Sequence, residues 1–307
     1  MDKREKFLSL LSKIEPRINT YLKYSDSKII RAFLVREKSF IKFLAILMKN
    51  VLGMDFKKKV KTFWGRDIYV YLADADASAL YFFNTLYGNE IKIIKFLIKN
   101  FKENDIFYDI GANYGFYTLL AQEFITNGEI YSFEPNPKIF KLLKESSRLD
   151  IFKNTFLNEV ALSNQAGEIE FYDSEISRHS GASSLIKHPY LRKYEVIKVK
   201  TTTLDEYILD HKPPTIMKID VEGGEPHVLK GASILIKKYS PIIIMEFLPD
   251  ELHREAANIL LNNGYRAFKI DSDGNLSIIN EKDLLRNDIF HEANYVFKKF
   301  EKKWKFV

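Results

Sequence analysis

The 307-residue chain contains no cysteine, which excludes a fold built on disulfide bonds and a zinc site built on thiolates. It has no apolar run of about 20 residues, the length needed to cross a bilayer. The N-terminus is charged and amphipathic and lacks the clean apolar run and cleavage site of a signal peptide. A cytoplasmic location is therefore expected. The hydrophobic fraction of 46% is typical of a globular chain with a substantial core.

Positive charge is concentrated near the N-terminus. Residues 1–60 carry 15 Lys or Arg and 6 Asp or Glu, a net charge of +9, whereas the whole chain carries +6. Apolar spacing from Lys3 to Val51 predicts two or three amphipathic helices, with an interruption at Pro16. Such an arm could contact an anionic membrane surface or an acidic acceptor, and it could equally be a solvated helix face. We therefore expect a basic helical N-terminal extension over residues 1–60 and one domain over residues 61–307.

Strand-like and helical segments alternate from about residue 90 to residue 265, which is typical of an α/β fold with a mostly parallel sheet and helices on both faces. The predicted sheet strands are 106–110, 129–134, 155–162, 214–221, 241–247, 265–270, 276–279 and 295–300. The predicted helices are 75–86, 90–101, 116–124, 137–149, 225–236 and 251–263. Outside this series, 167–172 and 195–201 are predicted strands, and 62–72 is a predicted strand or hairpin around residues 64–67.

The chain is organised around residues 105–117, where a buried strand leads through Gly111 and Gly115 into a helix. Such a turn lets the backbone approach a nucleotide-like ligand, with the helix amides facing it. The segment lacks the third glycine of the pyrophosphate fingerprint. Asp109 would repel a pyrophosphate and attract the sulfonium and ammonium groups of S-adenosylmethionine. Glu134 closes the next strand at the spacing of a carboxylate that binds ribose hydroxyls. The sequence therefore predicts S-adenosylmethionine as the cofactor.

Further candidate cofactor residues surround this turn. Asn113 could donate to the carboxylate of the cofactor or simply form the turn. Glu90 could reach the amino end of the cofactor or only complement a helix dipole. Glu159, at the end of the third strand, falls where this kind of fold holds adenine. The complete set of expected cofactor residues is Glu90, Asp109, Gly111, Ala112, Asn113, Gly115, Glu134, Pro135, Glu159, Val160 and Ala161.

Five motifs in this order resemble the FkbM family of class I S-adenosylmethionine-dependent methyltransferases, over about residues 86–272. They are Asp109-Ile110-Gly111-Ala112-Asn113-Tyr114-Gly115, Phe133-Glu134-Pro135-Asn136, Val160-Ala161-Leu162-Ser163, Thr203-Leu204-Asp205 and Lys218-Ile219-Asp220-Val221-Glu222-Gly223. The resemblance implies a Rossmann-like seven-stranded sheet with an antiparallel last strand. It also implies an O-methyltransferase acting on hydroxyl groups of sugars, glycans or other small molecules.

The predicted chemistry lies at the carboxyl ends of the fourth and fifth strands. Methyl transfer to a hydroxyl group requires a base, because a neutral alcohol is a poor nucleophile. Asp220 is the first candidate for this base. Lys218 could pair with Asp220 or stabilise the developing alkoxide, and Glu222 is a second candidate base or an acceptor-binding residue. These carboxylates, with Glu225 and Glu246, could instead hold Mg²⁺ against a vicinal diol or form a structural network. No metal ligand is assigned.

A polar loop over residues 173–188 could cover the acceptor. Ser183 and Ser184 are expected to anchor the loop or bind the acceptor and not to act as nucleophiles, and His179 or His188 could supply a base. Two alternative functions stay open. The basic arm suggests an RNA methyltransferase, although no RNA-binding module is recognisable, and a scaffold that retains the fold without catalysis would show no binding of the methyl donor. The oligomeric state is also open, and a homodimer is one possibility.

Overall fold

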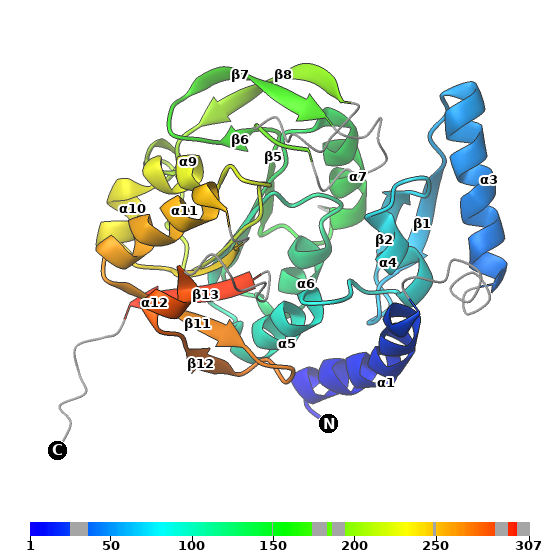
Figure 1. Cartoon of the computed structure of the whole chain (residues 1–307), viewed down its shortest axis with the longest axis horizontal. Coiled ribbons are helices and arrows are strands. Elements are labelled where there is room, and N and C mark those ends of the chain that lie inside the picture. The colour runs from blue at the N-terminus through cyan, green and yellow to red at the C-terminus, as the bar shows by residue number, and fades with distance from the viewer. Residues whose placement is uncertain are drawn as a thin grey trace.

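The structure is a computed structural model of the whole chain, shown in Figure 1. It describes residues 1–24, 36–148, 150–173, 183–185, 194–247, 250–285 and 294–299, and the structural statements below concern these residues. Helices cover both faces of one large central sheet (Figure 1). Among the helices in these ranges, none combines the length and the apolar character that crossing a membrane requires.

The strands of the central sheet are β3 (Ile106–Ile110), β4 (Glu129–Phe133), β5 (Thr155–Asn158), β9 (Ile216–Ile219), β10 (Ile242–Glu246), β11 (Tyr265–Ile270), β12 (Leu276–Ile278) and β13 (Asn294–Lys299). They lie in the order β12-β11-β13-β10-β9-β3-β4-β5. The five strands from β10 to β5 are parallel, and β13 runs antiparallel to both β10 and β11. The predicted α/β fold is confirmed, and the predicted strand 276–279 is β12, an antiparallel edge strand that gives the sheet eight strands where the family resemblance implies seven.

The two faces of the sheet are covered by different helices. One face packs against α5 (Glu90–Asn100), α6 (Phe116–Phe124) and α7 (Pro137–Ser147), and the other against α9 (Glu225–Lys230), α10 (Ser233–Lys238) and α11 (Glu251–Asn262). Along β3, Phe107 enters the first core, whereas Tyr108 and Ile110 enter the second. Because strand side chains alternate, Asp109 faces α6. The same alternation along β9 turns Lys218 toward that face, since Ile216 also enters the first core.

Two predicted elements differ from the structure. The predicted strand 155–162 is divided into β5 of the central sheet and β6 (Ala161–Leu162), which pairs with β8 (Glu195–Thr202) in a small sheet completed by β7 (Gly167–Asp173). The predicted helix 225–236 is divided into α9 and α10. A Cβ atom on Gly231, between them, would lie 2.1 Å from the carbonyl oxygen of Ser163, so the chain that follows β6 needs a glycine at this point. The short helices α4 (Ala77–Phe83), α8 (Leu204–Tyr207) and α12 (Glu281–Leu284) complete this part of the fold, and α12 was not predicted.

The N-terminal segment contains α1 (Lys3–Lys23) and α3 (Arg36–Leu52), as the apolar spacing predicts, and its last residues form a strand. Contrary to expectation, α1 continues through Pro16, because buried side chains on both sides of it, Leu11 and Ile18, pack on the same core. The strand is β1 (Lys57–Lys61), which pairs with β2 (Asp67–Tyr71) in a hairpin. The proposed boundary at residue 60 therefore falls inside β1, and the division into two domains stays a prediction.

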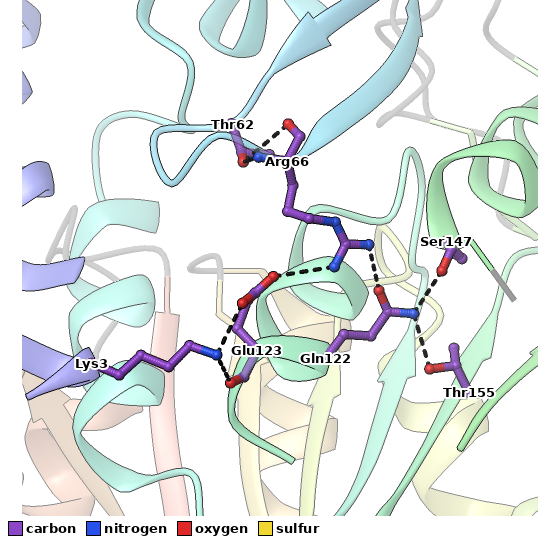
Figure 2. A network of polar contacts seen from close by, with 7 residues as sticks. All are labelled: Lys3, Thr62, Arg66, Gln122, Glu123, Ser147 and Thr155. Carbon is purple, nitrogen blue, oxygen red and sulfur yellow. Dashed lines mark hydrogen bonds and ion pairs between the residues drawn. The ribbon is translucent and has the colours of Figure 1, made fainter. Parts of the chain in front are cut away.

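A polar network joins the N-terminal segment to the helices of the first face (Figure 2). Arg66, in the turn of the hairpin, donates to Gln122 at 2.8 Å and to Glu123 at 3.2 Å, and both acceptors belong to α6. Lys3 of α1 forms an ion pair with Glu123 at 3.0 Å. Gln122 in turn donates to the carbonyl oxygen of Ser147 and to the hydroxyl group of Thr155. The network therefore connects α1, the hairpin, α6, the end of α7 and β5.

If α1 belongs to the core, truncating a buried side chain on it will destabilise the whole domain. We expect Leu11→Ala to lower the free energy of unfolding by about 2–5 kcal/mol, because Leu11 is fully buried. Leu52→Ala, at a site 62% exposed, should change it by less than about 0.5 kcal/mol. Urea denaturation of both variants measures the difference. Equal, small effects would show that residues 1–60 are an appended arm.

Candidate active site

A cavity opens at the carboxyl ends of β3, β4 and β9, where the strand order places the switch point of an α/β sheet. It spans about 660 Å³, including its open side. Of the expected cofactor residues, those lining it are Gly111, Asn113, Glu134, Pro135, Val160 and Ala161. Asp220 and Glu222 line it from the end of β9. Sequence positions far apart thus meet at one cavity.

The glycine turn between β3 and α6 holds the end of β9 in place. Gly111 has φ +80°, and a Cβ atom on it would lie 1.8 Å from the main-chain oxygen of Asp220. The amides of Gly111 and Ala112 both donate to the carbonyl oxygen of Phe133 at 3.0 Å. These two amides are therefore used within the protein. Gly115, with φ +89°, starts α6 where a Cβ atom would lie 2.4 Å from Leu143.

Glu134 is held in one orientation at the end of β4. Its two carboxylate oxygens accept the main-chain N–H groups of Asn113 and Asn136, each at 2.9 Å. Burial raises the pKa of Glu134 to about 7, although both N–H groups lower it. Each carboxylate oxygen has a second lone pair. Glu134 therefore presents an oriented acceptor to the cavity that it lines.

The small sheet forms an apolar wall on the opposite side of the cavity. Val160 and Ala161 reach this wall because the chain leaves β5 to start β6, and Phe171 of β7 and Leu185 line the same space. Glu159 does not share this position: its side chain is exposed and outside the cavity lining. The predicted role of Glu159 near adenine thus has no geometric support.

The polar loop expected to cover the acceptor is described only in part. Ser183 lines the cavity, and the hydroxyl group of Ser184 donates to the carbonyl oxygen of Glu222 at 2.8 Å. Ser184 therefore fastens this part of the loop to the turn after β9. His179 and His188 lie outside the described residues.

A buried cluster of charges lies beneath the cavity. Lys218 and Asp109 are register neighbours on β9 and β3. The Nζ atom of Lys218 lies 2.6 Å from Oδ2 of Asp220 and 4.8 Å from the ring centre of Tyr117. Burial lowers the pKa of Lys218, but the carboxylates of Asp220, Glu90 and Asp109 outweigh burial and raise it above its ordinary value. Lys218 therefore remains an ammonium group.

Asp109 differs from its expected position facing the cofactor. Its side chain is buried, is not part of the cavity lining, and accepts a hydrogen bond from Thr118 at 2.6 Å. Burial raises the pKa of Asp109, and the charge of Lys218 opposes this effect. The strand alternation that turns Asp109 toward α6 explains the difference.

Glu90 joins this cluster from the first turn of α5. It accepts hydrogen bonds from the hydroxyl group of Tyr117 and, at 3.1 Å, from the amide group of Asn294 on β13. Burial raises the pKa of Glu90, while Lys218 lowers it. Tyr117 lies in the glycine-turn segment and could have been selected from the sequence. Asn294 could not, because nothing local connects it with residue 90.

Three carboxylates meet at the ends of β9 and β10. Oxygen atoms of Asp220, Glu222 and Glu246 lie within 4.8 Å of one another, close enough to hold a metal ion together. Burial raises the pKa of Glu246 to about 9, and Asp220 and Glu225 add to the shift. Burial and the same neighbours raise the pKa of Glu222 well above its ordinary value. Glu225 itself accepts the N–H group of Val221 at 3.0 Å, which fixes the turn.

The fold and the carboxylate-lined cavity at its switch point define a class I type of methyltransferase architecture. Residues 109–267, more than half of the chain, match the Methyltransferase FkbM domain. The chain belongs to this family of S-adenosylmethionine-dependent methyltransferases, so the predicted family and class of enzyme are confirmed.

Two methyltransferases are similar in sequence to part of this chain. It is 28% identical over 158 residues to the hexuronic acid methyltransferase AglP of Haloferax volcanii, an alignment that covers 50% of this chain and 61% of that protein. It is 27% identical over 164 residues to the methyltransferase sdnD of Sordaria araneosa, covering 44% of this chain and 62% of that protein. The matches thus span about three-fifths of each relative. The crystal structure of methyltransferase FkbM from Methylobacillus flagellatus KT has a TM-score of 0.41 at 14% identity, covering 65% of this chain and 44% of that chain.

The close contact between Gly111 and Asp220 can be tested by adding one methyl group. We expect Gly111→Ala to lower the free energy of unfolding by about 2–5 kcal/mol, because the added Cβ atom meets a main-chain oxygen as well as a strained φ. Gly65→Ala is the matched control: φ is +97°, but nothing lies within 4 Å. Chemical denaturation of both variants separates the clash from the strain. Equal losses would show that the contact with Asp220 does not constrain the turn.

Proposed function

We propose that the chain transfers a methyl group from S-adenosylmethionine to a hydroxyl group of a sugar or glycan-linked small molecule, with Asp220 as the general base. The observation that carries this proposal is the position of Asp220. Its side chain is 29% exposed, lines the cavity, and is paired with the buried Lys218. The hexuronic acid named for the relative AglP supports a sugar as acceptor.

The residues of the cavity suit S-adenosylmethionine. Glu134 would accept the ribose hydroxyl groups, since both of its oxygens are already oriented by main-chain N–H groups. Val160, Ala161 and Phe171 would hold the adenine ring on the apolar wall. When bound, the cofactor supplies an electrophilic methyl group on a sulfonium centre.

The charge around the strand ends also suits a cationic ligand. Three carboxylates, those of Glu90, Asp109 and Asp220, act on the single ammonium group of Lys218. Their surplus of negative charge favours a sulfonium and an ammonium group nearby. In this proposal Asp109 acts indirectly, because its side chain does not line the cavity. Instead of contacting the cofactor, Asp109 helps to raise the pKa of Lys218 and accepts a hydrogen bond from Thr118.

The chemical step needs an aligned acceptor and a proton acceptor. The hydroxyl oxygen forms the new bond to the methyl carbon, the carbon–sulfur bond breaks with its electrons left on sulfur, and Asp220 takes the hydroxyl proton. Lys218 orients Asp220 through their 2.6 Å contact. Glu222 lines the same cavity and would hydrogen-bond the acceptor, and burial and the neighbouring carboxylates raise its pKa.

A second mode of action has its own geometric support. Asp220, Glu222 and Glu246 could hold Mg²⁺, which would bind two hydroxyl groups of the acceptor and lower their pKa. An ion would require Glu246 to lose the proton that its pKa of about 9 favours at neutral pH. The experiment on Asp220 therefore includes a chelator.

Replacing the proposed base should reduce turnover much more than donor binding. We expect Asp220→Asn to lower kcat by about 10²–10⁴-fold, while calorimetry shows a much smaller rise in the Kd for S-adenosylmethionine, because the carboxylates of Glu90 and Asp109 remain. Turnover is measured by mass spectrometry, as the mass of a methyl group added to hexuronic acids, nucleotide sugars and glycans. Glu159→Gln, an exposed carboxylate outside the cavity, is the control.

The outcomes separate the alternatives. Full wild-type activity in chelator with an inactive Asp220→Asn variant supports a base. Activity lost in chelator and restored by Mg²⁺ assigns the carboxylates to a metal, and normal turnover of Asp220→Asn excludes both roles for this residue. If the chain methylates RNA and no saccharide, the proposed sugar acceptor is wrong and RNA is the acceptor. An absence of donor binding in the wild type would indicate a scaffold.

The pKa of Glu134 gives a second prediction. Below pH 7 its carboxyl group becomes protonated and offers fewer acceptors to ribose, so the Kd for S-adenosylmethionine should rise by up to about tenfold for each unit that the pH falls. Glu134→Gln should weaken binding by about 1–3 kcal/mol at pH 8 and remove this pH dependence. Calorimetry across the pH range, with Glu159→Gln as control, measures both. An unchanged pH dependence in Glu134→Gln would assign it to another carboxylate.

A further inference from the structure

Helix α3 is oriented with its apolar side toward solvent. Phe40, Phe43, Leu44, Leu47 and Val51 recur at helical spacing and form one stripe, which we call the outer stripe. All five side chains are exposed, Phe40 to 64%, Phe43 to 59% and Val51 to 69%. In Figure 1, α3 lies at the edge of the molecule, beyond the β1–β2 hairpin.

The opposite side of α3 holds the helix in this orientation through its lysines. Lys38 donates to the carbonyl oxygen of Tyr81 at 2.7 Å, and Lys42 donates to that of Asp74 at 2.6 Å. Lys49 forms an ion pair with Asp55 at 2.9 Å. Ala45, between them, is buried. The usual arrangement of a surface helix, apolar side inward and charges outward, is therefore reversed.

Apolar exposure and positive charge continue beyond α3. Leu52, Met54 and Phe56 are exposed, and they are followed at once by the exposed Lys57 and Lys59 of β1. Residues 36–61 carry 8 Lys or Arg and 2 Asp or Glu, a net charge of +6. The outer stripe thus lies on a strongly basic stretch of chain.

We propose that the outer stripe binds the surface of a membrane rich in anionic lipids. A helix that lies in the plane of such a surface buries an apolar side at the boundary of headgroups and acyl chains, while nearby lysines meet anionic headgroups. A second copy of the chain fits less well, because the exposed lysines of two β1 strands would be brought together. Nucleic acid fits less well too, because the outer stripe has no hydrogen-bond donors. This inference does not depend on the acceptor or the catalytic base.

The test is flotation of the full-length chain with vesicles of phosphatidylcholine alone and of phosphatidylcholine mixed with phosphatidylglycerol. We expect binding to the anionic vesicles, weakened by salt, and little binding to the neutral ones. Phe43→Ser/Leu47→Ser should reduce binding by at least about tenfold. Leu209→Ser/Ile234→Ser removes two exposed apolar side chains elsewhere and should bind like the wild type.

Donor calorimetry and thermal unfolding of the variants show whether they are folded, which we expect because the replaced residues are exposed. A wild-type chain that binds neither kind of vesicle overturns the proposal. So does a Phe43→Ser/Leu47→Ser variant that is folded and binds as well as the wild type. If light scattering shows a wild-type dimer that this variant abolishes, the outer stripe is an interface between copies and the proposal fails.

Discussion

The buried ammonium group of Lys218 is the constraint on which the arrangement of the site depends. A charge removed from water destabilises a fold unless opposite charges and hydrogen bonds surround it. Oδ2 of Asp220 lies 2.6 Å from Nζ of Lys218, and Asp109 is the register neighbour of Lys218 on β3. Glu90 adds a third carboxylate from α5. Because these groups belong to different elements, compensating one charge fixes the positions of β3, β9 and α5 at the point where the cavity opens.

The carboxylates of the site differ in environment, and the difference separates their roles. Glu134 is buried beside main-chain donors and has a pKa of about 7, whereas Glu246 is buried near other carboxylates and has a pKa of about 9. The pKa of Glu222 is raised, as that of Glu246 is. Asp220 alone among these residues is paired with the ammonium group. Placing like groups in unlike environments is how one site provides both proton donors and proton acceptors near neutral pH.

The N-terminal segment shows how little net charge reveals about orientation. Its excess of lysine suggests a solvated basic face, yet Lys38 and Lys42 donate to carbonyl oxygens of the protein. The structure thereby divides the segment into two parts with different surroundings. Helix α1 contributes Phe7 and Leu11 to the main core, and α3 is attached mainly by polar contacts.

The sequence by itself determined the parts of this protein that depend on local patterns. Apolar periodicity predicted β3, α5, α6 and β10 closely, the glycine turn lies at the cavity, and Glu134, selected from its spacing, lines that cavity. The parallel arrangement of the sheet strands was predicted from the alternation of strands and helices along the chain. These features could be predicted because side-chain periodicity and turn formation depend on a few neighbouring residues.

Only the tertiary structure decided which distant groups meet. It placed Asp109 beside Lys218 and beneath the cavity, left Glu159 outside, and brought Asn294 to Glu90. It also divided the predicted third strand and turned the apolar side of α3 outward. An amphipathic pattern defines two sides of a helix without saying which one meets the protein, and a buried charge acquires its partners from chain segments that only folding brings together.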